Sequence, residues 1–339
     1  MSADPPLILV TGATGFIASQ LIPRLLGRGH RVRALARRPR PIESLPWSKA
    51  VEIVTGDVLT AASLRPALQG VHTAYYLIHG MSSGRGYAER DLLAARNFAQ
   101  AAADAGVRHI IYLGALADPE QVLASHLRSR IDTGAMLRLG AVPVTEFRVG
   151  VIAGAGSTSF QMIRRVTERL PIVAANPWLR HKTQPIAAQN AVDYLIAALE
   201  KRPDRNRVFE IGGPEVTTYA DLMLRYAGVR GLKRRVVLIP GLPVWLMALG
   251  IALLTPVAPC VARAVVGGLS SDSIVTHGDA LRAFPEVRLV DFASAAREAL
   301  AQTRPAAGRN SSRPVSSPWF VRSWHSLFAG RPRQSTATI

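Results

Sequence analysis

The chain has 339 residues, of which 48% are hydrophobic and 19% charged, and its formal net charge is +18. This balance excludes a disordered chain, and the length suffices for one large domain or two smaller ones. The positive charge would favour nucleic acid or an anionic surface as a partner. However, only four of the 41 basic residues are lysine, and no predicted helix or strand interleaves basic with aromatic residues. Nucleic acid is therefore not expected as a partner.

Cysteine content and the N-terminal sequence indicate the cellular compartment. Cys260 is the single cysteine, so the sequence predicts neither a disulfide framework nor a metal cluster. The first ten residues, MSADPPLILV, carry no basic region and only a short apolar run, unlike a secretory signal. We expect a cytoplasmic protein without a bound metal.

Residues 7–152 alternate short apolar runs with amphipathic stretches. Strands are expected at 7–11, 32–36, 51–57, 74–79, 109–114 and 144–152. Helices are expected at 15–27 and in a longer stretch that ends at Gly106. Apolar runs between amphipathic helices indicate βαβ units. The sequence therefore predicts an α/β fold of the Rossmann type, with a doubly wound parallel sheet.

The regular pattern loosens after Gly150. A glycine-rich loop and a helix are expected in 153–173, a further helix at 189–201 and a strand at 207–213. The predicted Rossmann domain consists of 1–153 with 187–212, and a smaller C-terminal substrate-side domain consists of 154–186 and 213–300. Residues 301–339 are rich in serine, proline and arginine and are expected to form a flexible basic tail.

The sequence TGATGFIA, residues 11–18, lies between the first predicted strand and the first predicted helix. Gly12 permits a tight turn, and Gly15 lets the backbone approach a pyrophosphate at the start of the helix. Ala18 stands where a third small residue governs the packing of the helix on the strand. A glycine pattern alone is a weak signal, but this one has the strand–turn–helix context that dinucleotide binding requires.

The end of the second predicted strand indicates which dinucleotide binds. An acidic residue there would bind the ribose 2′-hydroxyl of NAD(H), whereas arginine accommodates the 2′-phosphate of NADP(H). The strand ends in Ala36-Arg37-Arg38, and the nearest acidic residue, Glu43, follows two prolines. We therefore expect NADP(H) rather than NAD(H). The alternative is that Arg37 and Arg38 only continue the general excess of arginine.

Motifs along most of the chain resemble a known superfamily. They are TGATGFIAS from residue 11, GD at 56–57, YLIHGM at 76–81, HLRSRIDTGAMLR at 126–138, FRVGVIAGAGS at 147–157 and VFEIGGPEVTTYADL at 208–222. This series resembles the atypical short-chain dehydrogenase/reductases (SDRs), in particular their NmrA-like NAD(P)H-binding group. The resemblance implies pyrophosphate contacts by Gly12, Thr14, Gly15, Phe16 and Ile17. It also implies adenine contacts by Asp57 and Val58, and contacts near the nicotinamide by Leu77, Ile78 and His79.

The catalytic residues of this superfamily are largely replaced here. Ordinary members carry Tyr-x3-Lys on a helix and a serine after the preceding strand. The same spacing holds His126 and Arg130, and Gly114-Ala115 stands where the serine is expected. Three interpretations remain open. His126 exchanges a proton while Arg130 holds the cofactor; or Arg130 only binds the cofactor of a protein that senses it; or the pair is a solvated helix face.

Two further segments are candidates for ligand contact. His79 ends the strand expected to reach the nicotinamide and begins the loop 79–84, which could fold over a ligand. The alternative for His79 is a hydrogen bond within that loop. Residues 178–182, WLRHK, place three basic groups beside an aromatic ring. They are a candidate clamp for an acidic substrate group or, alternatively, an exposed turn.

Residues 236–262 contain no charged residue and are flanked by arginines. Four prolines leave only 244–255 uninterrupted, which gives about 18 Å of helix against a hydrocarbon core of about 30 Å. A transmembrane helix is therefore not expected. A buried helix of the substrate-side domain is the first expectation, and contact with a membrane surface is the second. In the second case we expect an apolar substrate.

These observations predict an NADP(H)-dependent oxidoreductase that transfers a hydride to or from a hydrophobic small molecule. The alternative is a non-catalytic protein that binds NAD(P)H as a redox sensor, or as an assembly factor for a membrane complex. A third class is nucleic-acid or anionic-lipid binding through the tail, whose last 36 residues carry six arginines and no acidic residue.

Overall fold

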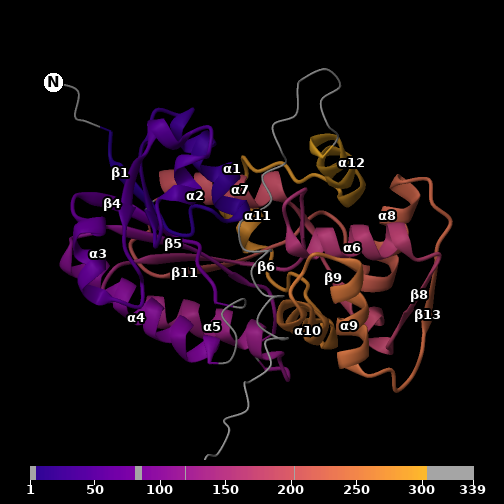
Figure 1. The fold of residues 1–339 in the computed structure, drawn as a ribbon. Coiled ribbons are helices and arrows are strands. Elements are labelled where there is room, and N and C mark those ends of the chain that lie inside the picture. The colour runs from indigo at the N-terminus through magenta and orange to yellow at the C-terminus, as the bar shows by residue number, and fades with distance from the viewer. Residues whose placement is uncertain (1–4, 81–85, 119, 202, 304–339) are drawn as a thin grey trace, which may run out of the picture.

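The computed structural model describes residues 5–80, 86–118, 120–201 and 203–303 (Figure 1). The predicted tail beyond residue 303 and most of the loop 79–84 therefore lie outside the described residues. Within these ranges, no helix combines the length and the hydropathy that crossing a membrane requires.

A seven-stranded parallel sheet forms the centre of the N-terminal lobe. Its strand order is β11-β6-β5-β4-β1-β2-β3. The strands are β1 (Leu7–Val10), β2 (Arg31–Ala36), β3 (Glu52–Thr55), β4 (Val71–Tyr76), β5 (His109–Ala115), β6 (Val144–Val149) and β11 (Arg207–Ile211). The strand order reverses between β1 and β4, and ligands bind beyond the carboxyl ends of strands at such a point. The doubly wound α/β fold expected from the sequence is confirmed.

Helices cover both faces of this sheet (Figure 1). One face carries α1 (Phe16–Leu26), α7 (Ala188–Glu200) and the short α2 (Arg40–Glu43) and α11 (Asp279–Ala283). The other face carries α3 (Ala61–Leu68), α4 (Tyr87–Asp104) and α5 (Ser125–Arg138). Because both faces are covered, β1 and β5 are buried along their whole length. This explains why their sequences are continuous apolar runs.

The C-terminal lobe consists mainly of helices joined by pairs of short strands. Its helices are α6 (Thr158–Arg169), α8 (Tyr219–Val229), α9 (Val244–Leu254), α10 (Pro259–Gly267) and α12 (Phe292–Gln302). The strand pairs are β7 (Ile152–Ala153) with β10 (Ile186–Ala187), β9 (Lys182–Thr183) with β12 (Thr217–Thr218), and β8 (Ile172–Ala175) with β13 (Arg235–Leu238). Phe160 of α6 packs edge-on against Tyr226 of α8 and Phe292 of α12, which joins three helices in one core.

The chain passes between the two lobes at closely packed glycines. A Cβ atom on Gly213 would lie 2.2 Å from the carbonyl oxygen of Pro185. A Cβ atom on Gly150 would lie 2.5 Å from the Ser273 Oγ, and this hydroxyl donates a hydrogen bond to the carbonyl of Leu116. Side chains larger than hydrogen do not fit at these passages, so the lobes are held in close contact.

Two sequence-based expectations differ from the structure. β4 ends at Tyr76, so His79 lies beyond the strand rather than at its end. The first expectation for 244–255, a buried helix, is wrong: within α9 only Ala248 is buried. The helix forms where predicted because Pro243 and Pro256 bound it, but the described residues cover only one of its sides.

Candidate functional site

One cavity of about 1940 Å³ runs from the glycine turn of the N-terminal lobe to α9 and α10 of the C-terminal lobe. Sites for single small ligands measure about 300–1,000 Å³, so this cavity has room for a dinucleotide and a second ligand. The structure brings all the predicted site residues to its wall. They are Gly12, Thr14, Gly15, Phe16, Ile17, Arg37, Arg38, Asp57, Val58, Leu77, Ile78, His79, His126 and Arg130.

The glycine turn has the geometry of an anion site. Gly12 has a φ of +63°, and a Cβ atom there would lie 2.7 Å from the carbonyl oxygen of Leu77. Only glycine therefore allows β1 and the end of β4 to approach so closely. Gly15 is the N-cap of α1, and no side chain caps the amides of the first helical turn. These amides can therefore bind a pyrophosphate.

The adenine end of the predicted cofactor site is formed by the turns after β2 and β3. Arg37 and Arg38 are exposed and line the cavity, whereas Glu43 lies in α2 outside it. The Asp57 carboxylate accepts a hydrogen bond from the Leu59 amide at 3.0 Å and stabilises the second turn. No acidic side chain follows β2 at the position where NAD(H) would need one.

His126 begins α5 and is only 8% exposed, so the third interpretation, a solvated helix face, is wrong. Its ring packs against Gly268 at the end of α10, where a Cβ atom would lie 2.8 Å from Cε1. The Nδ1 atom has no hydrogen-bond partner among the described residues. Burial and, to a smaller extent, Arg130 lower the pKa of His126 to about 4, so the ring is neutral at pH 7.

Arg130 lies one turn after His126 and is held by the end of β5. Its Nη2 donates to the carbonyl oxygens of Leu113 and Gly114, at 2.6 and 3.2 Å. The Tyr112 hydroxyl in turn donates to the carbonyl of Arg130 at 2.8 Å. The guanidinium is therefore fixed at the carboxyl end of the strand, beside the cavity, where the nicotinamide end of a dinucleotide is expected.

A buried ion pair fixes α5 on the sheet. Glu146 of β6 is fully buried and pairs with Arg138 at the end of α5 and with Arg148 of its own strand. The helix approaches Glu146 closely at Gly134, where a Cβ atom would lie 2.5 Å from Oε2. The positions of His126 and Arg130 thus depend on a contact two turns further along the same helix.

Sequence analysis missed Asp91, a carboxylate that also lines the cavity. It is 9% exposed and accepts hydrogen bonds from the Gly80 amide and the Ser129 hydroxyl, at 3.2 and 3.1 Å. Burial raises the pKa of Asp91, although these hydrogen bonds oppose the shift. Its signal was available, because Asp91 shares the apolar face of its helix with Ala94, Ala95 and Phe98.

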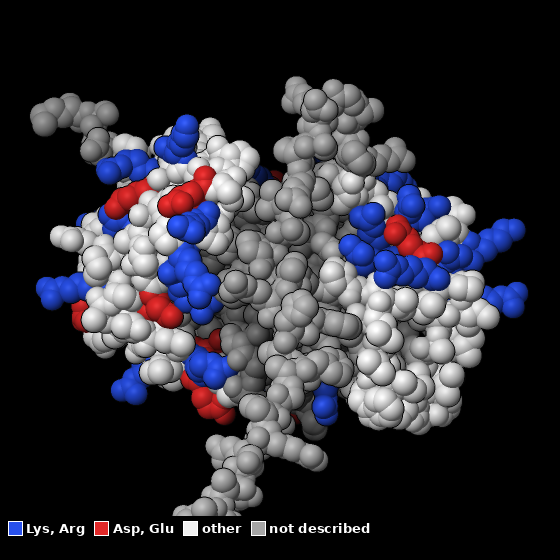
Figure 2. Space-filling model, in the orientation of Figure 1, with Lys and Arg blue, Asp and Glu red and all other residues white. Residues whose placement is uncertain are grey.

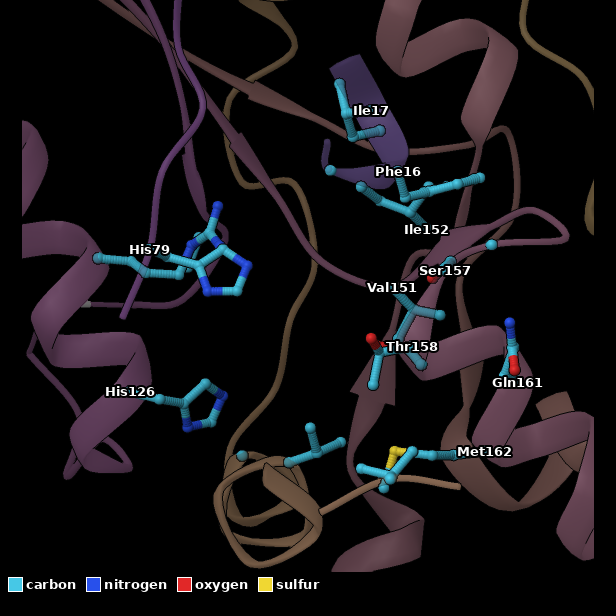
Figure 3. Close-up of a pocket in the computed structure, with 18 of the residues that line it drawn as sticks. Phe16, Ile17, His79, His126, Val151, Ile152, Ser157, Thr158, Gln161 and Met162 are labelled. Carbon is cyan, nitrogen blue, oxygen red and sulfur yellow. The ribbon is translucent and has the colours of Figure 1, made fainter. Parts of the chain in front are cut away.

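His79 and His126 face the same open space, and Val151, Thr158 and Met162 lie on the opposite side of it (Figure 3). His79 is exposed to this space. The protein that encloses the cavity, together with Arg130, lowers its pKa. Both imidazoles are placed to contact a ligand that lies between the lobes.

The far end of the cavity is an apolar chamber that sequence analysis did not find. Its wall includes Met162 of α6, Met247 and Ile251 of α9, and Val265 of α10, which are far apart in the sequence. The predicted clamp at 178–182 does not contribute its basic groups, since only Leu179 lines the cavity. The His181 ring instead bonds to the carbonyl of Leu269 at 2.7 Å.

Comparison with known proteins identifies the N-terminal part of the chain. Residues 12–133 match a family model described as NAD(P)H-binding. Triphenylmethane reductase from Citrobacter sp., solved in complex with NADP(H), has a TM-score of 0.69 at 20% identity and covers 86% of this chain and 99% of that one. UDP-glucose 4-epimerase from Thermotoga maritima has a TM-score of 0.65 at 13% identity, with coverage of 88% and 99%. These structural likenesses concern the fold.

Sequence relatives cover between a third and two thirds of this chain. Cinnamoyl-CoA reductase 1 from Oryza sativa subsp. japonica is 34% identical over 117 residues, which are 33% of this chain and 35% of that protein. The (4-alkanoyl-5-oxo-2,5-dihydrofuran-3-yl)methyl phosphate reductase of Streptomyces griseus is 28% identical over 232 residues, 66% of this chain and 74% of that protein. The match thus spans about a third of the rice enzyme's length.

Proposed function

We propose that this chain, whose residues 12–133 match an NAD(P)H-binding family model, is an NADP(H)-dependent oxidoreductase of the short-chain dehydrogenase/reductase type that acts on a hydrophobic small molecule. The observation that carries this proposal is the single cavity. It joins the glycine turn and the loop at His79 to the apolar chamber between α6, α9 and α10. A nicotinamide held at one end would therefore meet an apolar ligand held at the other.

The side chains at the junction support hydride transfer. Reduction of a carbonyl places negative charge on its oxygen, and a neutral imidazole can donate a hydrogen bond to that oxygen. His126 is neutral, and its side chain lines the cavity. Arg130 adds a fixed positive charge nearby. Because a pKa of about 4 makes His126 a weak acid catalyst at pH 7, the proton itself would come from solvent in the cavity.

The proposed reaction is tested by NADPH oxidation with a panel of apolar ketones, aldehydes and enones. We expect turnover with some members, and His126→Ala to lower kcat about 10-fold to 100-fold while the Kd for NADPH changes little. His277→Ala, at an exposed histidine outside the cavity, is the matched control. Turnover that is equal in wild type and His126→Ala would exclude the role given to this imidazole.

The preference for NADP(H) has its own test. Replacing both Arg37 and Arg38 by alanine should weaken NADPH binding about 10-fold to 100-fold and leave NADH binding almost unchanged, because only NADPH carries the 2′-phosphate. Arg40→Ala is the control, since Arg40 is exposed but does not line the cavity. Isothermal titration calorimetry measures the affinities for NADPH and NADH of wild type, of the double variant and of the control. Tighter binding of NADH than NADPH by wild type would refute the preference.

A second candidate function is a sensor that binds NAD(P)H without turnover. The absence of the serine and tyrosine of the ordinary triad favours it, because little remains to polarise a carbonyl. The same assays separate the two functions. If NADPH raises the melting temperature but no panel member oxidises it, the sensor function gains support. If neither dinucleotide binds, both functions fail.

A further inference from the structure

The outer side of α9 is an exposed apolar surface. Trp245, Leu249 and Leu253 follow one another at intervals of four residues, so they share one face of the helix. Their exposed fractions are 59%, 46% and 73%. Before α9, Val237 in β13 and Ile239 just after this strand are both more than 40% exposed. We call these five residues the α9 face. Large exposed apolar side chains gathered in this way mark an interaction surface.

Basic residues outnumber acidic ones around the α9 face, although Arg225 and Arg230 pair with Glu215 and Glu168. Residues 222–271 contain six basic residues and no acidic one. Lys233 and Arg235 are exposed just before the face, and Arg263 is exposed just after it. The surface over α9 and β13, at the lower right of Figure 2, carries no blue or red atoms, and mainly blue side chains, with some red atoms among them, lie along its upper border. An apolar centre with a basic border matches an anionic lipid surface.

We propose that the α9 face docks onto an anionic bilayer, with Trp245, Leu249 and Leu253 inserted at the level of the headgroups. A second copy of the chain is disfavoured as the occupant, because it would bring two basic borders together on molecules of charge +18. The chain's own tail is disfavoured for the same reason, since its last 36 residues carry six arginines and no acidic residue.

The opposite side of α9 faces the cavity. Met247, Ile251 and Leu254 line the apolar chamber, and Leu246 both lines it and is 41% exposed, so it lies at the rim. The chamber and the proposed lipid surface therefore lie on the two sides of one helix. From this we infer that the hydrophobic substrate reaches the chamber from the bilayer. This step rests on the proposed function, whereas docking does not.

Docking is tested by co-sedimentation of the full chain with vesicles of phosphatidylcholine containing about one third phosphatidylserine. We expect the doubly substituted Trp245→Glu, Leu253→Glu chain to bind at least about tenfold more weakly than wild type. The matched control carries Val122→Glu and Leu139→Glu, which add the same charge at two apolar positions elsewhere that are still more exposed. This control should bind within about threefold of wild type, and both variants should keep the wild-type melting temperature in NADPH.

Other outcomes would overturn the proposal. Equal loss in both doubly substituted chains would show that charge alone decides binding. If vesicle binding is lost when the six tail arginines are replaced by glutamine and the α9 face is left intact, the tail rather than the α9 face binds the vesicles. If the wild-type chain is a dimer that does not bind vesicles, and the Trp245→Glu, Leu253→Glu chain is a monomer, the α9 face is a self-association surface. Because co-sedimentation needs no turnover, its failure is distinct from failure of the reductase assay.

Discussion

Gly12 is the residue on which the glycine turn of the predicted cofactor site depends most directly. Its φ of +63° and the Leu77 carbonyl, 2.7 Å from where a Cβ atom would lie, each require glycine. Gly12→Ala should therefore destabilise the fold by about 1–3 kcal/mol and weaken NADPH binding at least about tenfold. Gly29→Ala separates the two causes, because Gly29 has a φ of +78° but no atom within 4 Å of its missing Cβ. Urea unfolding and NADPH titration measure both effects.

If Gly29→Ala and Gly12→Ala cost the same stability and Gly12→Ala keeps its affinity for NADPH, the close approach of β1 to the end of β4 has no bearing on binding. The sequence already indicated Gly12, because a glycine after an apolar strand and before a helix is a local pattern. The contact with Leu77 is not local, since 65 residues separate the two positions, and only the folded chain reveals it.

His126 makes stability depend on pH in a defined direction. Its pKa is about 4 in the folded chain and 6.5 as the reference value, so between these values the unfolded chain binds more protons. The stabilising contribution is complete above about pH 6.5 and is lost as the pH falls towards 4. Wild type should lose about 1–2 kcal/mol more stability than His126→Gln between about pH 7 and about pH 5.

Chemical unfolding at the two pH values measures this difference. His277→Gln serves as the control at an exposed histidine and should keep the wild-type dependence. An unchanged dependence in His126→Gln would mean that the imidazole is solvated in the folded chain. The spacing of His126 and Arg130 suggested their proximity to a ligand, but spacing carries no information about burial, and burial decides the protonation state.

At the scale of elements, α5 packs against α4 and β5 and also meets the buried Glu146 of β6. Gly134→Ala would raise the helix propensity of α5 by about 1 kcal/mol. However, the added methyl group would meet the Glu146 carboxylate, which is fully buried and paired with Arg138 and Arg148. We therefore expect a net loss of about 1–3 kcal/mol and a lower affinity for NADPH.

Gly228→Ala in α8 is the matched control for this substitution, because nothing lies within 4 Å of its missing Cβ. It should stabilise the protein by about 0.5–1 kcal/mol. Thermal unfolding of both variants is the measurement. If Gly134→Ala also stabilises the protein, the Glu146 side chain can move aside, and the ion pair does not fix the helix.

The predicted elements are accurate where the signal is local. The strands of the parallel sheet were found within a few residues, because each is a buried apolar run bounded by glycine or polar residues. For α9 the sequence predicted the helix correctly, but the prediction that this helix is buried is wrong. Prolines bound the helix locally, whereas its burial depends on which other segments pack against it, and those lie far away in the sequence. The apolar chamber was missed for the same reason.

On the scale of the whole molecule, one ligand should stabilise both lobes. The cavity wall includes residues of the sheet, of α5 and of α6, α9 and α10, so a bound dinucleotide with its substrate would bridge the lobes. At a concentration of 100 times Kd, NADPH should add about 2.7 kcal/mol to the free energy of unfolding. Differential scanning calorimetry should show one transition that moves upward. Two transitions, of which only one moves, would contradict a shared site.

The glycines at the passages between the lobes limit how the molecule can open. At Gly213 the carbonyl oxygen of Pro185 leaves no space for a methyl group, and at Gly150 the Ser273 hydroxyl would have to move, so both passages are closely packed. A bulky ligand would then enter and leave by rotation of the side chains around Leu246. The rate of ligand exchange would depend on the size of these side chains more than on motion of the backbone. Lineages that acquire new substrates would accordingly be expected to vary α9 and to keep the glycines.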